Sequence, residues 1–211
     1  LLSRCNTFFH KNILRNWKAC IIALQSAEPV ISYDENLKII DKCLNALCTM
    51  VCTDRSLFGW PMLMYGSLQS SGGSILWNGI NAGARIRSAE SDWWYEDISC
   101  LCINIFEKLI KKMKTRGIMA ESIAGVIMYY TQKYVPVWRR TTGSLSLTLT
   151  NSTADQKSLI ETIVKLLPEK KDRSYCGFLL VLLRTGLILG VTVECKDVLE
   201  KRIGMQLELA N

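Results

Sequence analysis

Apolar residues recur three and four positions apart along most of this 211-residue chain. That spacing gives each successive segment the single apolar stripe of an amphipathic α-helix, which has to be buried against other helices. The clearest case follows a capping box formed by Ser32 and Glu35, two side chains that satisfy free backbone N–H groups at a helix start. Its stripe consists of Leu37, Ile40, Leu44, Leu47 and Val51. The pattern predicts an all-α bundle or array of about eight or nine helices, with essentially no strands.

The same period places further helices in both halves of the chain. We expect two short helices within residues 1–26, a helix that follows Asp92 and ends at Gly117, and helices at 120–134, 153–167, 174–189 and 194–203. In the helix that follows Asp92, the residues expected to be buried are Trp94, Ile98, Leu101, Ile105, Leu109 and Met113. The most apolar run, 178–191, is shorter than the roughly 18 residues of a membrane span and contains Arg184. It is interpreted as a buried core helix.

Two segments lack the helical period. Residues 54–91 contain a Gly/Ser-rich stretch at 67–74 together with scattered aromatic residues, which predicts one long structured loop pinned to the surface by Phe58, Gly59, Trp60 and Pro61. Residues 141–151 are expected to form a second loop. It would join the helical halves 1–140 and 152–211 of a single domain spanning residues 1–211.

Signs of catalysis are absent from the sequence. The only histidine, His10, has no acidic neighbour, and no phosphate-binding loop is present. Nine cysteines lie among apolar residues, which favours free, buried thiols in a reducing compartment. Cys48 and Cys52 have the spacing of two zinc ligands, but nothing supplies the other two. We therefore expect no enzyme activity, no cofactor and no metal site.

The positive charge is concentrated in one segment. Of the net charge of +7, residues 104–140 contribute eight basic and two acidic groups, whereas residues 1–103 are balanced at nine of each. The candidate basic face consists of Lys108, Lys111, Lys112, Lys114 and Arg116. Cations in the last turns of a helix complement its dipole, which is the favoured interpretation. The alternative is a surface for anionic lipid or an acidic partner. Nucleic acid is not expected, because the nearby tyrosines follow helical spacing.

Four stretches carry a resemblance to a known family. They are Ser56–Pro61 (SLFGWP), Asp92–Ile98 (DWWYEDI), Ile127–Pro136 (IMYYTQKYVP), and Cys176–Leu180 (CGFLL) together with Glu200–Leu207 (EKRIGMQL). In order and approximate spacing they resemble the plant-specific non-phototropic hypocotyl 3 family, whose members are adaptors in phototropism and auxin responses. The motif residues are expected to be structural: Phe58, Gly59, Trp60, Pro61, Trp93, Trp94, Glu96, Asp97, Arg202 and Gly204.

The residue types of these motifs are expected to have structural roles. Trp93 and Trp94 at a helix start are expected to anchor the core, since a buried tryptophan contributes a large apolar area. Glu96 and Asp97 are first-turn acids. Gly204 either breaks the last helix or marks a close approach of another segment.

The resemblance implies a function. In that family a BTB domain docks on cullin-3 and the helical domain recruits clients such as photoreceptor kinases. The chain is thus expected to be the non-catalytic, client-recruiting module of a cullin-3 RING ubiquitin ligase adaptor, in the cytoplasm or at the inner face of the plasma membrane. It resembles part of the family domain, with the BTB domain outside these residues. The alternative is a peripheral membrane scaffold that uses the basic surface without ubiquitin. If clients bind, the expected mode is an exposed surface between helices that takes an apolar helix or peptide.

Overall fold

The computed structural model describes residues 2–29, 38–52, 74–77, 80–85, 93–135 and 153–206. Within these ranges the chain is built mainly of α-helices, so the predicted all-α class is confirmed. The helices in chain order are α1 (Leu2–Phe8), the π-helix η1 (Phe9–Ile13), α2 (Trp17–Ala27), α3 (Ile39–Val51), α4 (Tyr95–Ile98), α5 (Ile103–Thr115), α6 (Ala120–Tyr134), α8 (Thr153–Leu166), α9 (Arg173–Leu189) and α10 (Val193–Gly204).

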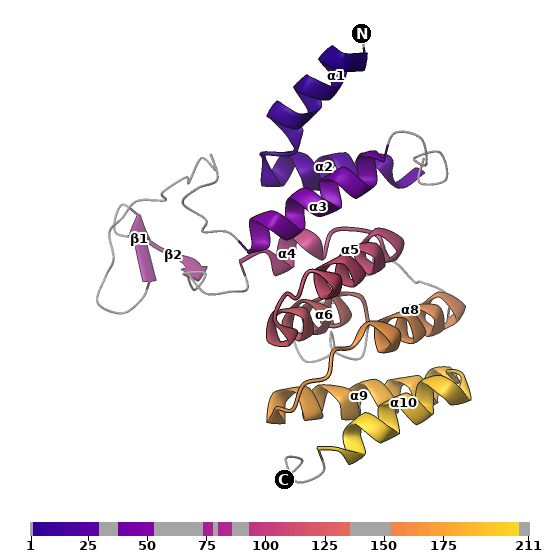
Figure 1. Ribbon diagram of the computed structural model, residues 1–211. Helices are drawn as coiled ribbons and strands as arrows, with labels where there is room; N and C mark the ends of the chain where they lie inside the picture. Colours follow the sequence, from indigo (N-terminus) through magenta and orange to yellow (C-terminus); the bar gives the residue numbers. More distant parts are fainter. Residues whose placement is uncertain are drawn as a thin grey trace.

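The helices are stacked in layers along one direction (Figure 1). α2 packs on α3, α3 on α5, and α5 on both α6 and α8; α8 then contacts α9 and α10, which pack on each other. α1 projects from the N-terminal end of this stack, and the α9–α10 pair forms its other end (Figure 1). One continuous apolar core includes buried residues of every helix from α2 onward. The architecture therefore leaves α9 and α10 covered by helices on one side of their layer.

One short hairpin departs from the prediction. β1 (Ser74–Trp77) pairs antiparallel with β2 (Ile80–Arg85), with Trp77 opposite Ile80 and an irregularity between Ser74 and Leu76. The expectation of no strands is wrong for these residues. The missed signal is Asn78-Gly79, the dipeptide that favours a two-residue hairpin turn between apolar runs. The rest of the expected Gly/Ser-rich loop, the Phe58–Pro61 motif and loop 141–151 lie outside the described residues.

The stripe predicted for the 37–51 segment is largely confirmed. Ile40, Leu44 and Leu47 are buried in the core. The helix α3 begins at Ile39, and its N-cap Lys38 adopts a left-handed backbone with φ of 51° and no side-chain cap. The capping box at 32–35 lies outside the described residues.

The helix predicted between Asp92 and Gly117 is interrupted. α4 ends at Ile98 and α5 begins at Ile103, although the apolar residues predicted to line this segment are all buried. The Ser99 hydroxyl donates to the Glu96 carbonyl at 2.6 Å, while the α6 hydroxyl of Tyr134 donates to the Ser99 carbonyl at 2.8 Å. The hydroxyl of Tyr130 donates to the Leu101 carbonyl at 3.2 Å. Side chains of α6 thus stabilise a turn where the local pattern alone favours helix.

The later helix ends agree closely with the prediction. Gly117 has φ of 72° and closes α5 in a Schellman motif, in which the Ile118 N–H donates to the Met113 carbonyl at 3.1 Å. Gly190, with φ of 63°, ends α9 in the same way. The bounds of α6, α8, α9 and α10 each lie within one residue of those predicted.

Candidate interaction surfaces

Two of the five predicted basic residues bind α3. Lys112 Nζ lies 2.8 Å from the Asp41 carboxylate, and this hydrogen bond lowers the pKa of Asp41 below its usual value. The Arg116 guanidinium donates to the Thr49 hydroxyl at 2.8 Å and to the Asn45 side-chain oxygen at 3.2 Å. These cations fasten α5 to its neighbour.

A third cation takes part in a junction at the end of α8. Lys114 Nζ donates to the Leu167 carbonyl at 3.4 Å, and Arg202 of α10 donates to the same carbonyl at 3.2 Å and to that of Pro168 at 2.8 Å. The hydroxyl of Tyr175 on α9 also donates to Pro168, at 3.0 Å. Cations at this position satisfy the free carbonyls of a helix C-terminus and complement its dipole.

The pKa values at this junction follow from its burial. Partial burial, and then the charge of Arg202, lower the pKa of Lys114. Burial raises the pKa of Tyr175 to about 12, so its hydroxyl keeps the proton that it donates. Through its hydrogen bonds to the Leu167 and Pro168 carbonyls, the family-motif residue Arg202 attaches α10 to the segment that connects α8 with α9.

The two remaining cations, Lys108 and Lys111, have no hydrogen bond to another helix in the described part of the protein, although the charge of Lys108 helps to lower the pKa of Asp41. Lys111 pairs with Glu107 one turn earlier on α5, at 2.7 Å, and Lys108 is exposed. Three of the five residues, Lys112, Lys114 and Arg116, thus also bind groups of the protein itself. That these five residues form an interaction face for anionic lipid or an acidic partner stays a prediction.

The tryptophan motif links α4 to the N-terminal layer. Trp94 is buried in the core as predicted, and Trp93 is half-buried with its ring centroid 4.8 Å from that of Trp17. The Trp17 indole N–H donates to the Asp97 carboxylate at 2.9 Å. Asp97 is thus a partner of α2 as well as a first-turn acid, whereas Glu96 is exposed.

Gly204 lies where the sequence placed the end of the last helix. It is the final residue of α10, and a Cβ built there would have no described atom within 4 Å. In the described part of the protein the alternative of a close approach at Gly204 is therefore wrong.

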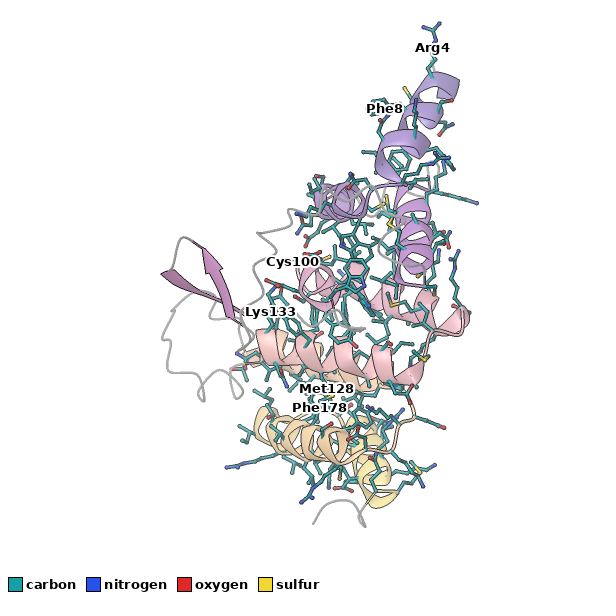
Figure 2. All side chains as sticks on the ribbon, turned by 90° about the vertical axis from the view of Figure 1, so that its left-hand side faces the viewer. Arg4, Phe8, Cys100, Met128, Lys133 and Phe178 are labelled. Carbon is teal, nitrogen blue, oxygen red and sulfur yellow. The ribbon has the colours of Figure 1, made fainter. Side chains whose placement is uncertain are left out.

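The thiols with shifted pKa values are held in their protonated form. The pKa of Cys20 is raised mainly by its hydrogen bond with Cys43 and, to a smaller extent, by burial. Burial raises the pKa of Cys48 to about 11. The exposed Cys100 accepts a hydrogen bond from Lys133 Nζ at 3.4 Å, and the two lie together in Figure 2. His10 is exposed on η1.

The described part of the chain contains neither a cluster of metal-binding side chains nor a helix suited to span a membrane. There, no three His, Cys, Asp or Glu side chains are close enough together to hold a metal ion. None of the helices described is long and apolar enough to cross a bilayer.

α9 exposes an apolar face that the sequence predicted to be buried. One side of α9 lies in the core, but the opposite side has exposed fractions of 42% for Leu180, 56% for Leu187 and 71% for Ile188. Val181 is exposed as well, and Arg184 lies between these apolar residues. The interpretation of this run as a buried core helix is therefore wrong for the side of α9 that carries these residues. The sequence carries a second apolar stripe at the same three- and four-residue spacing, so the pattern alone does not tell which of the two stripes is buried.

Comparisons with known proteins agree with the motifs. The sequence profile of the NPH3 family matches residues 92–211. The chain is 58% identical over 228 residues to BTB/POZ domain-containing protein At3g44820 of Arabidopsis thaliana, and 31% identical over 212 residues to the Phototropic-responsive NPH3 family protein NPY2 of the same plant. These alignments cover 100% of this chain but 35% and 32% of the two relatives. The chain thus spans about a third of the length of these relatives.

No solved structure is significantly similar to the chain. The profile match nevertheless extends over more than half of its residues, and it includes the Trp93–Trp94 segment and the helices α5 to α10 described above. The chain belongs to the NPH3 family.

Proposed function

We propose that this chain is the client-recruiting, non-catalytic part of a BTB-containing adaptor for a cullin-3 RING ubiquitin ligase. It acts in the cytoplasm of plant cells, in signalling of the phototropic or auxin type. The observation that carries the proposal is the alignment of the whole chain with relatives named for a BTB/POZ domain or for phototropic responses.

The fold supports a binding role over a catalytic one. The described helices form a stack with an apolar core, and its terminal layer presents exposed apolar side chains on α9. The thiols of Cys20 and Cys48 have raised pKa values, whereas a cysteine nucleophile needs its thiolate at neutral pH. These features suit a platform that holds another protein.

The length of the relatives supports separate binding roles for the BTB/POZ domain and for the present helices. The relatives are about three times as long as this chain, which leaves room outside the aligned region for the BTB/POZ domain in their names. In our proposal that domain binds cullin-3 and the present helices bind the client. The alternative of a basic membrane surface draws no support from α5, since Lys112, Lys114 and Arg116 contact protein groups.

Co-precipitation from plant cells tests both halves of the proposal. The full-length protein is compared with a form lacking the BTB domain and a form lacking this chain, with cullin-3 and a phototropism photoreceptor kinase as the two probes. We expect cullin-3 to be lost only without the BTB domain, and the kinase only without this chain. Failure of the intact protein to bind cullin-3 contradicts the ligase role. Retention of the kinase without this chain contradicts the recruiting role.

A further inference from the structure

The solvent-facing side of α9 is unusually apolar for an exposed helix surface. A helix at the side of a globular protein normally turns polar residues to solvent. On α9 the solvent side carries Leu180, Val181, Leu187 and Ile188, with Arg184 as the single charged residue among them. Among the described helices, α9 lies at one end of the stack, where it packs against α8 and α10 (Figure 1).

The spacing of these residues matches the way in which one helix binds another. Two apolar pairs, at 180–181 and 187–188, lie one heptad apart on the same side of α9, with Arg184 midway between them. Nine residues of helix extend over about 13 Å, which is roughly two and a half turns of a partner helix. This is the anchor pattern of an amphipathic helix bound along a helical surface.

Arg184 determines the charge of the partner. It is exposed, and it has no hydrogen bond or ion pair with any residue in the described part of the protein. A wholly apolar partner would strip water from the guanidinium and leave it unpaired, which is costly. An aspartate or glutamate opposite Arg184 would instead form a charge-assisted, bidentate hydrogen bond.

The same residue argues against a second copy of this chain as the partner. Residue 184 is the midpoint of the stripe 180–188, so two α9 helices that pair through this stripe, parallel or antiparallel, bring their Arg184 side chains together. Like charges that meet at the centre of a desolvated contact oppose association.

We propose that the α9 stripe, defined as Leu180, Val181, Arg184, Leu187 and Ile188, is the docking surface for an amphipathic helix of a client protein. The client helix places an acidic side chain against Arg184 and apolar side chains on either side of it. The identification of this helix as a client's rests on the proposed function. The docking itself depends only on the surface of α9.

The test uses the full-length protein and two fluorescent synthetic helices of about 18 residues. Both carry leucines along one face, and they differ only in a central glutamate or lysine on that face. Fluorescence anisotropy should show the glutamate helix binding at least about tenfold more tightly, because the lysine would face Arg184. Arg184→Glu should reverse this preference.

Matched substitutions locate the site. Ile188→Ser should weaken binding of the glutamate helix by about tenfold or more, since it removes an apolar anchor. Ile22→Ser, at another strongly exposed isoleucine, on α2, should leave binding unchanged. Circular dichroism of each variant should match that of the parent protein, because both side chains face solvent.

Three results would overturn the docking proposal. They are equal binding of the two helices, no binding by the full-length protein, and a dimer in analytical ultracentrifugation that Ile188→Ser dissociates. The second result would mean that another segment of the protein covers α9. None of these results changes the association of the full-length protein with cullin-3, so failure here is distinct from failure of the proposed function.

Discussion

At the scale of single residues, the family motifs act through contacts between distant parts of the chain. The sequence predicts that Trp94 is buried, because its place on a helical stripe shows it. It does not show that Asp97 accepts a hydrogen bond from Trp17, 80 positions away, or that Arg202 binds the Leu167 carbonyl. Periodicity reports which face of a helix is buried, whereas partners across the core depend on how the helices are stacked.

Gly125 of α6 provides a test of one such contact. A Cβ at this position would lie 2.7 Å from Tyr95 Cε2, so Gly125→Ala should force the aromatic ring of the motif out of place. We expect a loss of about 1–3 kcal/mol of unfolding free energy, measured by urea denaturation. Gly177→Ala is the matched control, since its Cβ meets open space and alanine favours helix by up to about 1 kcal/mol. Equal effects of the two substitutions would contradict the packing of Tyr95 on α6.

Asp172 caps α9 and should make stability depend on pH. Its carboxylate accepts from the Ser174 N–H at 2.8 Å and pairs with Lys170 at 3.1 Å, and these contacts lower its pKa in the folded state. A lowered folded-state pKa stabilises the protein above the unfolded-state pKa of about 3.9, and the contribution is lost as the pH falls through the folded-state value.

Asp172→Ala should therefore cost about 1 kcal/mol near neutral pH, the usual value of an N-cap. The difference from the parent should shrink in urea titrations below about pH 4. Asp197→Ala, at an exposed aspartate of α10, serves as the control and should change little at either pH. A deficit that stays constant with pH would show that the carboxylate charge plays no part in the cap.

At the scale of secondary-structure elements, prediction succeeded where a local signal marks an end. Gly117 and Gly190 adopt the left-handed conformation that glycine favours, and the helices end there. It failed at the break between α4 and α5, because the hydroxyls of Tyr130 and Tyr134 on another helix hold the turn. A pattern read along one segment contains no information about such partners.

The junction at the C-terminus of α8 tests how elements are joined. Arg202→Ala removes two charged hydrogen bonds to backbone carbonyls and should cost about 1.5–3 kcal/mol in urea denaturation. Arg202→Lys should restore only part of this, because an ammonium lacks the planar fork of donors. Lys201→Ala, at the exposed neighbouring position, should stay within about 0.5 kcal/mol of the parent. If the alanine variants at 201 and 202 behave alike, the junction does not hold α10.

At the scale of the whole molecule, the apolar periodicity predicts a bundle or array of helices, and the motifs identify its family. The outer face of α9 could not be predicted, since a helix that is apolar on both sides offers no contrast between core and surface. The charge of 104–140 was equally ambiguous: only the packed structure shows that Lys112, Lys114 and Arg116 bind neighbouring elements. Which residues remain available to a partner is therefore a property of the stack.

Hydroxyl-radical footprinting of the full-length protein tests this account most directly. α9 contains its own reference, because Leu179 and Leu182 are buried while Leu187 and Ile188 are exposed. We predict that Leu187 and Ile188 are modified clearly faster than the two buried leucines, and that the glutamate-bearing helix protects them. Protection of Leu187 and Ile188 to the level of Leu179 and Leu182 in the protein alone would contradict an open α9 surface that receives clients.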